Sequence, residues 1–408
     1  MPESVRGALR DVAGKLVAPA RAAAGRRRTR GASRRDDGWV DVIVPVHDVG
    51  SMIDETIRSV LAQDRWRFTL IVLDDASADD TAERVERWVR RDSRVRLERV
   101  AYRDPNATRN HGIAHAAGEY LTFLDGDDVL RPGALRDLVA SVEATGSDFA
   151  VGSYDRLEGA RRRTPPAFWI DEAHARERRA IRLEQFPDIL VNAVQWTKLY
   201  RREFWESAEL SFPEGGHFQD QLVSAKAYAR ARAFDVLQRK TVDWRIRSDG
   251  SSMTQQGVRA SQVRDRFGTA IGALAVLAAE SDAVVHRSRT TQYLSNDTAV
   301  AASEVRNMDE DAFGELRTGL GRLSALADSE IWAEVPAESK VLYEFVLRGD
   351  RARAVEYLDR GGLSSLRHEI AERDGIAYLV LPFWGDAEAA VPLDRFRASP
   401  RELRARSI

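Results

Sequence analysis

The sequence predicts an α/β protein with a mostly parallel central sheet and helices on both of its faces. Apolar, β-branched runs of strand length alternate with amphipathic runs of helix length up to about residue 255, and this alternation is typical of βαβ units. Acidic residues follow several of the apolar runs directly, at the strand ends where such sheets bind ligands. After about residue 256 the pattern changes to successive helices.

Four strands and three helices are expected first. The strands are WVDVIVPVHD (39–48), FTLIVLDDAS (68–77), VRLERVA (95–101) and YLTFL running into DGDD (120–128), and the helices are 51–64, 78–92 and 107–119. The continuous apolar runs indicate strands that are buried on both faces. The first helix carries Ile53, Ile57, Val60 and Leu61 on one face, which is the face expected to pack on the sheet.

The remaining elements are expected from shorter patterns. They are a strand at 147–157, a strand or turn passing into a helix at 191–207, the glycine loop FPEGGHFQD (212–220) opening a helix at about Gln219, a strand and turn at 242–254, and strand-like runs near the end, including AAVPLDRFR (389–397). We expect four regions: a basic tail (1–38), the α/β domain (39–255), a helical domain (256–371) and a short β-containing segment (372–408).

The composition excludes several classes of protein. A formal net charge of −2 argues against a chain that coats nucleic acid, and the absence of cysteine excludes disulfides and thiolate metal sites. The apolar stretch 270–279 is half the ~20 residues that a membrane-spanning helix needs, so it is expected to be a buried helix. We expect a cytoplasmic chain. Its basic tail is either disordered or an amphipathic helix resting on the anionic inner face of a membrane.

Asp74 and Asp75 end the second expected strand. A carboxylate in this position can accept hydrogen bonds from a nucleobase or a ribose. Taken alone, the pair is more typical of a helix N-cap. Two successive acidic residues before Ser77 exceed what capping requires, so a ligand contact is also predicted.

The segment DGDD (125–128) follows the fourth expected strand. Oxygen-only clusters suit Mg²⁺ or Mn²⁺, which proteins hold with one or two carboxylates and substrate phosphates. The alternation is expected to point Asp125 and Asp127 the same way, while Gly126 lets a ligand approach the backbone. A solvated surface turn fits poorly, because the preceding run is a buried strand. We therefore expect a divalent cation that bridges a diphosphate and assists the departure of a nucleotide.

Four motifs resemble the family 2 glycosyltransferases of the GT-A fold. They are VIVPVHDV (42–49), IVLDDASADDT (71–81), ATRNHGIAHAAGEYLTFLDGDD (107–128) and FPEGGHFQD (212–220). The resemblance covers roughly residues 39–255 and is strongest to bacterial enzymes that decorate teichoic acids or capsular polymers. It implies a nucleotide-sugar site made of Pro45, Val46, His47, Asp48, Asp74, Asp75, Arg109, Asn110, Asp125 and Gly126.

Within that site, the resemblance implies specific roles. Asp75 would meet the uracil or ribose of a UDP-sugar, and Arg109 would lie near the nucleotide. Asp125 and Asp127 correspond to the DxD motif of the family, with Mn²⁺ or Mg²⁺ bound by Asp127 in particular. The chain departs from the family at His47, where an aromatic residue is common, and at Gly50, where an acidic residue is common.

The resemblance also implies a catalytic base. In an inverting transfer a carboxylate takes the proton of the acceptor hydroxyl, and Asp220 matches the family's aspartate. Gln219 stands where the family has a glutamate on the acceptor side, and loss of that charge is expected to lower the Asp220 pKa. Asp220 is also suited to the N-terminal turn of a helix, a role that is compatible with catalysis.

Three further groups are interpreted from shorter patterns. The resemblance implies that Lys198 shapes the acceptor side, whereas the residue alone could equally lie on a solvated helix face. The resemblance also implies that Arg245 or Arg247 clamps the diphosphate, as arginine does well, and on a strand the two would point to one face. The histidines at 111, 115 and 217 are interpreted as rim or core residues rather than ligands.

Together these features predict an inverting, metal-dependent glycosyltransferase that uses a UDP-sugar and a hydroxyl acceptor on a cell-envelope glycopolymer or lipid-linked precursor. One alternative is a sugar-polymer-binding scaffold without turnover, which Gln219 and Gly50 would favour. The other is a nucleotidyltransferase, which is disfavoured because PVHDVGSM (45–52) contains no lysine to hold a triphosphate. The helical region is expected to pack on the α/β domain, to position the acceptor or to mediate oligomerisation.

Overall fold

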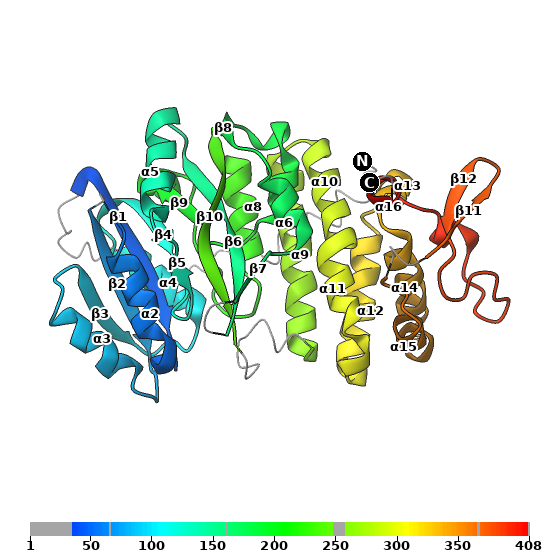
Figure 1. Cartoon of the computed structure of the whole chain (residues 1–408), viewed down its shortest axis with the longest axis horizontal. Coiled ribbons are helices and arrows are strands. Elements are labelled where there is room, and N and C mark those ends of the chain that lie inside the picture. Colours follow the sequence, from blue (N-terminus) through cyan, green and yellow to red (C-terminus); the bar gives the residue numbers. More distant parts are fainter. Residues whose placement is uncertain (1–34, 65–66, 160–161, 248–257, 365–367, 407–408) are drawn as a thin grey trace.

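The structure is a computed structural model that describes residues 35–64, 67–159, 162–247, 258–364 and 368–406. A large sheet with helices on both faces occupies one end of the elongated molecule, and a helical region occupies the other (Figure 1). The sheet strands are β1 Arg35–Val46, β2 Phe68–Asp75, β3 Val95–Val100, β4 Gly118–Phe123, β5 Val129–Leu130, β6 Phe149–Glu158, β7 Arg162–Thr164, β8 Arg178–Ile181, β9 Lys198–Arg201 and β10 Phe234–Ile246.

The direction of the strand order reverses within the sheet, and the reversal lies beside β1. The order is β3-β2-β1-β4-β9-β6-β10-β5, with β7 on β6 and β8 on β10. Strands β3, β2, β1 and β4 are parallel neighbours, and the antiparallel β9 joins them to the parallel pair β6 and β10. The chain crosses from β3 back to the far side of β1 to form β4, so the direction of the strand order reverses beside β1. Ligands bind at the carboxyl ends of strands at such a reversal. The predicted fold class is confirmed.

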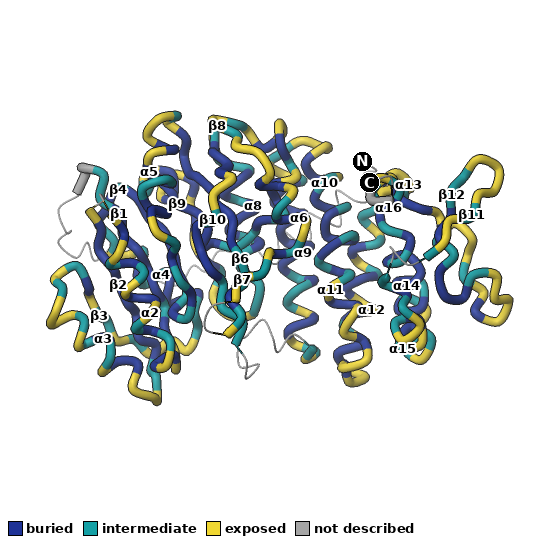
Figure 2. The backbone as a smooth tube through the Cα atoms, in the orientation of Figure 1, coloured by how far each residue is buried: buried dark blue, intermediate teal, exposed yellow. Residues whose placement is uncertain are grey.

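Helices cover both faces because side chains of a buried strand alternate between them. These helices are α2 Gly50–Leu61, α3 Thr81–Val89, α4 Pro105–His115, α5 Ala134–Thr145, α6 Phe168–Ala173, α7 Arg202–Ser207 and α8 Asp220–Arg230. Val42 and Val44 of β1 pack with Ile53 and Ile57 of α2, whereas Ile43 joins the cluster on the opposite face. Figure 2 shows the resulting buried strands between half-buried helices.

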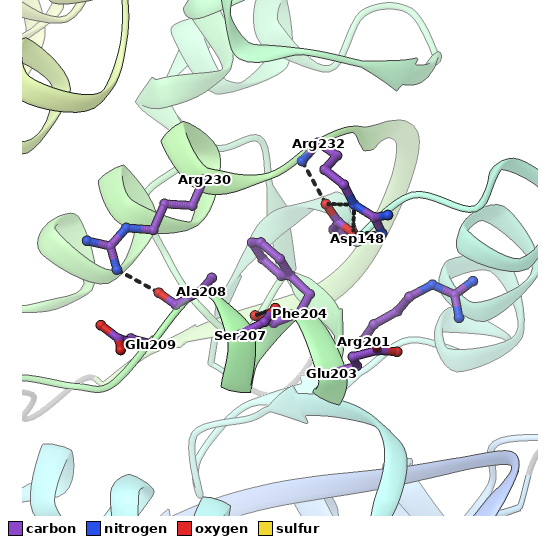
Figure 3. Close-up of a pocket in the computed structure, with 9 residues that line it drawn as sticks. All are labelled: Asp148, Arg201, Glu203, Phe204, Ser207, Ala208, Glu209, Arg230 and Arg232. Atoms are coloured by element: carbon purple, nitrogen blue, oxygen red, sulfur yellow. Dashed lines mark hydrogen bonds and ion pairs between the residues drawn. The ribbon is translucent and has the colours of Figure 1, made fainter.

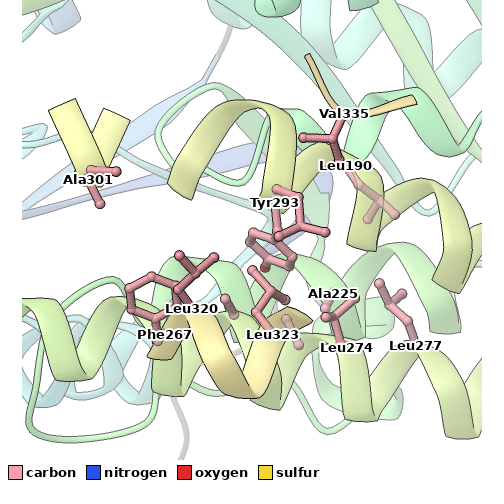
Figure 4. Close-up of a cluster of buried hydrophobic side chains, with 14 of the residues drawn as sticks. Leu190, Ala225, Phe267, Leu274, Leu277, Tyr293, Ala301, Leu320, Leu323 and Val335 are labelled. Carbon is pink, nitrogen blue, oxygen red and sulfur yellow. The ribbon is translucent and has the colours of Figure 1, made fainter. Parts of the chain in front are cut away.

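The helical region shares its core with the sheet domain. It comprises α9 Ala260–Glu280, α10 Ala283–Gln292, α11 Thr298–Ser303, α12 Glu310–Ser324, α13 Ser329–Glu334, α14 Ala337–Arg348 and α15 Arg351–Asp359. Leu274 and Leu277 of α9 lie beside Ala225 of α8, and Leu320 and Leu323 of α12 close the cluster (Figure 4). The apolar stretch 270–279 is therefore a buried helix, as predicted. Among the described residues, no helix is long and apolar enough to cross a membrane.

Several expected boundaries differ in the structure. Strand β1 begins at Arg35, inside the range assigned to the basic tail, and residues 1–34 of that tail lie outside the described residues. The boundary expected at 255 also lies outside them. The C-terminal hairpin, β11 Ile370–Arg373 and β12 Ile376–Leu379, begins two residues before 372.

The run AAVPLDRFR, expected to be strand-like, instead contains a 3₁₀ turn at Leu393–Phe396. Pro392 precedes this turn and has no N–H to give to a sheet. The last helix, α16 Pro400–Arg406, returns to the helical region, where the Glu402 carboxylate accepts from the Ala337 N–H at 3.0 Å. The C-terminal segment is thus anchored to the N-terminus of α14.

Candidate active site

A tight turn at Asp125–Asp128 forms an acidic rim at the carboxyl end of β4. The Asp128 N–H donates to the Asp125 carbonyl at 3.0 Å, and Thr56 of α2 places its hydroxyl 2.9 Å from the Gly126 carbonyl and 2.8 Å from that of Asp128. The segment is a turn rather than extended strand, so strand alternation does not set the directions of Asp125 and Asp127, and their common direction stays a prediction. The turn brings the carboxylates together instead.

Arginines from two distant elements face these carboxylates. Arg109 of α4 donates to Asp125 at 2.6 Å, and Arg247, just beyond β10, donates to Asp127 at 2.7 Å. Burial raises the pKa of Asp127, and burial together with repulsion from Asp127 and Asp125 raises that of Asp128. Within the described residues, arginine is therefore the cation that offsets the clustered charge.

Arg245 and Arg247 both reach the acidic turn, in agreement with the expectation that they share one face of a strand. The Arg245 backbone N–H donates to Asp128 at 2.8 Å, and its side chain donates to the Asp127 carbonyl at 2.7 Å and to Glu55 at 2.6 Å. Both guanidinium groups are therefore held at the edge where a diphosphate is expected. Their contact with phosphate stays a prediction.

Gly126 is required by packing against the first strand. A Cβ atom at this position would meet Val46 Cγ1 at 2.6 Å and the Pro45 carbonyl at 3.3 Å. The space that a Cβ would take at Gly126 is thus filled by the end of β1, and the expected approach of a ligand to the backbone stays a prediction. Pro45 and Val46 position the acidic turn by this contact.

Asp75 organises the loop that precedes α4. Its carboxylate accepts from the backbone N–H groups of Arg103 (2.8 Å) and Asp104 (2.9 Å) and from the Thr108 hydroxyl (2.9 Å). The side chain is buried, and the base or ribose contact predicted for it remains a prediction. Its neighbour Asp74 is also buried, and no described residue donates a hydrogen bond to its Oδ1.

His47 and Asp48 join the ends of β1 and β2. The His47 ring lies with Nδ1 2.8 Å from the Asp75 carbonyl, and Asp48 Oδ1 accepts from the Ala78 N–H at 2.7 Å. The Gly50 N–H donates to Asp79 at 2.8 Å. Position 50 has no side-chain carboxylate of its own, but the Asp79 carboxylate lies beside it.

Asp220 begins α8 on the other side of Arg109. Burial raises its pKa, and the nearby negative charge of Asp125 acts in the same direction, while Arg109 opposes it. The expected effect of Gln219, a pKa lower than a glutamate at that position would give, stays a prediction, because the observed rise is relative to an ordinary aspartate. Gln219 itself turns back and donates to the Gly215 carbonyl at 3.1 Å.

Two polar residues that support Asp75 and Asp220 were not predicted. Thr108 is one, through its bond to Asp75. The other is Gln195, a buried residue that donates to the Asp220 carbonyl at 3.1 Å and accepts from the Tyr200 hydroxyl at 2.7 Å. The only signal in the sequence was a glutamine inside the apolar run VNAVQWTKLY, which does not say what it contacts.

Helix α4 also connects the nucleotide side to the glycine loop. The Asn110 side chain exchanges two hydrogen bonds with the Phe212 backbone, at 2.8 and 2.9 Å. Asp104, whose N–H is bonded to Asp75, accepts from the Gly215 N–H. Asn110 therefore positions the segment before α8, and its predicted nucleotide contact stays a prediction.

Lys198 lies beneath the site in the core. Its side chain is fully buried and donates to the Asn192 carbonyl at 2.9 Å and to the Val194 carbonyl at 2.5 Å. Burial lowers its pKa to about 7. The solvated-face interpretation is wrong, and any influence on the acceptor side acts through the 192–194 loop.

Of the three histidines that sequence analysis interpreted together as rim or core residues, the structure brings two beside one carboxylate. His111 and His115 lie one turn apart on α4, and both face Glu98 of β3. His217 instead pairs with Asp265 at 2.8 Å. The four-residue spacing of His111 and His115 was the available signal.

A cavity on the opposite edge of the sheet does not contain this chemistry. It is lined by Asp148, which precedes β6, by Arg201, which ends the antiparallel β9, and by Arg230 and Arg232 (Figure 3). Arg230 donates to the Ala208 carbonyl and Arg232 to Asp148. The cavity thus lies at the amino ends of the parallel strands, away from the acidic rim.

Comparison with known proteins matches part of the chain to a family model. The model of glycosyl transferase family 2 matches residues 41–207. Residues 41–207 form a family 2 glycosyltransferase domain. The glycosyltransferase domain contains β1 to β4, the acidic rim and β9, while α8, Arg245 and Arg247 follow it along the chain.

Curated relatives are similar over the glycosyltransferase domain. The uncharacterized glycosyltransferase EpsJ of Bacillus subtilis is 29% identical over 200 residues, which is 48% of this chain and 58% of that protein. The poly(ribitol-phosphate) β-N-acetylglucosaminyltransferase TarS of Staphylococcus aureus is 27% identical over 52% of this chain and 36% of its own length. The chain thus spans less than two thirds of these relatives.

Solved structures extend the likeness beyond the glycosyltransferase domain. The crystal structure of S. aureus TarS 1–349 in complex with UDP-GlcNAc aligns with a TM-score of 0.65 and 19% identity, over 84% of this chain and 97% of that one. The GT-A fold is therefore present. The aligned 84% of the 408 residues is longer than the part of the chain that precedes residue 260, so helices after residue 260 also take part in the likeness.

Proposed function

We propose that this chain is an inverting, metal-dependent glycosyltransferase that moves a sugar from a UDP-sugar to a hydroxyl of a cell-envelope glycopolymer or lipid-linked acceptor. One observation carries the proposal. Asp125 and Asp127, far from Asp220 in sequence, gather with Arg109 at the carboxyl edge of β4, beside the reversal of strand order. This is the edge at which an α/β sheet binds its ligand.

The names of the relatives support the choice of donor and acceptor. TarS, crystallised with UDP-GlcNAc, is named as a transferase to poly(ribitol-phosphate). A second relative, from Campylobacter jejuni, is named a GalNAc(5)-diNAcBac-PP-undecaprenol β-1,3-glucosyltransferase and is 37% identical over 102 residues, 24% of this chain and 33% of that protein. Both names combine a sugar with an envelope-type acceptor, one a phosphate polymer and one a lipid-linked glycan.

Asp220 is assigned the base in this reaction. Its carboxylate takes the proton of the acceptor hydroxyl while the acceptor oxygen bonds to the anomeric carbon and the bond from that carbon to the diphosphate breaks. UDP leaves with the electron pair of that bond. The raised pKa of Asp220 suits this role, because a base is most effective when its pKa approaches the working pH. Arg245 and Arg247 are placed to accept the leaving diphosphate.

The acidic rim fits Mn²⁺ or Mg²⁺. Its donors are all oxygens, and the side chain of Asp125 remains 33% exposed despite its bond to Arg109. Asp127 fits if Arg247 exchanges its carboxylate partner for the diphosphate. When bound, the ion would neutralise charge on the departing diphosphate.

The test is transfer and hydrolysis of a panel of UDP-sugars with Mn²⁺ or Mg²⁺, read as released UDP. We expect turnover with at least one donor, loss of turnover with chelator, and a 10²–10⁴-fold lower kcat in Asp220→Asn. The matched control is Asp265→Asn, which removes a carboxylate of α9 that pairs with His217. The anomeric configuration of the product, read by NMR, tests inversion.

Full activity in Asp220→Asn would remove the base assignment. Tight UDP binding without turnover toward any donor would favour the scaffold alternative instead. Incorporation of a nucleotide from a nucleoside triphosphate would favour the nucleotidyltransferase.

A further inference from the structure

Glu98, His111 and His115 form a compact cluster on the outer side of α4. One ligand atom from each residue lies within 4.8 Å of the other two. His111 Nε2 is 2.8 Å from Glu98 Oε2, and His115 Nδ1 is 3.7 Å from the same oxygen. His115 Nδ1 also donates to the His111 backbone carbonyl at 2.9 Å, a hydrogen bond that an ion bound at this nitrogen would replace. The exposed fractions of the three side chains are 22% for His111, 32% for Glu98 and 51% for His115, so an ion could enter from solvent.

The donor set and its spacing match a metal of the zinc class. Two histidines four residues apart on a helix present their rings on one face, the arrangement by which helices hold zinc. Ligands of a tetrahedral Zn²⁺ with bonds of about 2.1 Å stand roughly 3.4 Å from one another. The observed separations of 2.8 and 3.7 Å bracket that value. Imidazole also favours Zn²⁺, Co²⁺ or Ni²⁺ over Mg²⁺.

A fourth residue orients one of the rings. The Tyr102 hydroxyl lies 3.1 Å from His111 Nδ1, the nitrogen that does not face Glu98. Metal-bound histidines usually bond a partner through their second nitrogen, which fixes the tautomer that leaves the first nitrogen free to bind. Tyr102 can do this for His111, because a phenol oxygen can accept the Nδ1 proton.

We propose that Glu98, His111 and His115 bind one divalent ion of the zinc class, with water completing the coordination, at a site that shares no residue with the acidic rim. The ion ties β3, the edge strand of the sheet, to α4. Tyr102 precedes the Arg103–Asp104 segment that holds the Asp75 carboxylate, so the site also fixes the start of the loop beside the nucleotide pocket.

The test titrates Co²⁺ and Zn²⁺ into the full-length chain, free of affinity tag and pretreated with chelator. We expect one equivalent of Co²⁺ with the visible absorption of a tetrahedral complex, displaced by Zn²⁺. His111→Ala and His115→Ala should each weaken binding at least 100-fold, and Tyr102→Phe about 10-fold. Zn²⁺ should raise the Tm of the wild type but not that of His115→Ala.

The controls separate this site from the acidic rim. His217→Ala removes another histidine that pairs with a single carboxylate, and it should bind Co²⁺ as the wild type does. Asp127→Ala should also bind Co²⁺ normally even if it abolishes Mn²⁺-dependent turnover. Absence of stoichiometric Co²⁺ binding would overturn the proposal. So would binding that survives both single histidine variants, and neither result bears on glycosyl transfer.

Discussion

Arg247 and a divalent cation compete for the Asp127 carboxylate, and this competition can be measured. The Arg247 Nε donates to Asp127 Oδ2 at 2.7 Å, and the two side chains are only 19% and 13% exposed, so solvent screens the pair weakly. A metal that binds Asp127 must displace this arginine. We therefore expect Arg247→Gln to increase the affinity of the chain for Mn²⁺ in the absence of nucleotide.

The size of the effect follows from the bond that is removed. A hydrogen bond to a charged group contributes about 1.5–3 kcal/mol, and this range corresponds to a Kd that is tighter by about 10- to 150-fold. With a UDP-sugar the sign should reverse, because the arginine is then needed at the diphosphate and its loss raises KM. The diagnostic result is a lower Kd for Mn²⁺ together with a higher KM for the UDP-sugar.

Arg245→Gln is the matched control. It removes the same charge from the same strand end, but Arg245 bonds Glu55 and the Asp127 carbonyl rather than the Asp127 carboxylate. Mn²⁺ affinity is measured by calorimetry and, independently, by the EPR signal of free Mn²⁺. If Arg247→Gln binds Mn²⁺ no more tightly than Arg245→Gln does, the competition does not exist and Asp127 is not the ligand.

Three further predictions concern the residues around the rim. Thr108→Val removes a donor to the Asp75 carboxylate, so it should lower the free energy of unfolding by about 1.5–3 kcal/mol. The control Thr122→Val should lower it by about 0.5–1.5 kcal/mol, because the Thr122 hydroxyl donates to a neutral backbone carbonyl. Urea denaturation measures both losses. Gly126→Ala should cost about 1–3 kcal/mol by overpacking and should weaken UDP affinity, read by calorimetry. The kcat/KM should rise with pH and level off above the raised pKa of Asp220, because only its ionised form accepts a proton.

Each of these has an outcome that contradicts it. Equal losses in Thr108→Val and Thr122→Val would mean that the Asp75 carboxylate is not a charged acceptor in the folded chain. A Gly126→Ala protein as stable as the wild type would mean that the end of β1 relaxes easily. An acidic limb of the pH profile centred at the ordinary aspartate value would contradict a buried base. The raised pKa also has a consequence for stability, since a carboxyl that holds its proton more tightly when folded stabilises the fold less as the pH rises towards that pKa.

The element types and the position of the acidic rim could be predicted because they depend on neighbours in the chain. The alternation of strand and helix appears in the apolar spacing, and acidic residues after a buried strand must lie at a sheet edge. The order of the strands follows from the same pattern only for β1 to β4. The antiparallel β9 was expected as a strand or a turn, and its place between β4 and β6 was not evident from its four residues.

Other features depend on pairs of residues that are far apart in the chain. Lys198 was expected either to shape the acceptor side or to lie on a solvated helix face, yet the backbone carbonyls of the 192–194 loop satisfy it inside the core. Gln195 reaches Asp220 across 25 positions, and Arg247 reaches Asp127 across 120. No local pattern records such pairs.

By itself, therefore, the sequence determined the α/β architecture, the helical region after it and the edge at which acidic residues gather. Only the tertiary structure decided which cation faces each carboxylate, that burial raises the Asp220 pKa, and that Glu98 meets two histidines of α4. The physical reason is the separation along the chain over which each kind of interaction acts. Backbone periodicity is set by residues a few positions apart, whereas charge pairing and burial are set by whichever segments the folded sheet brings into contact.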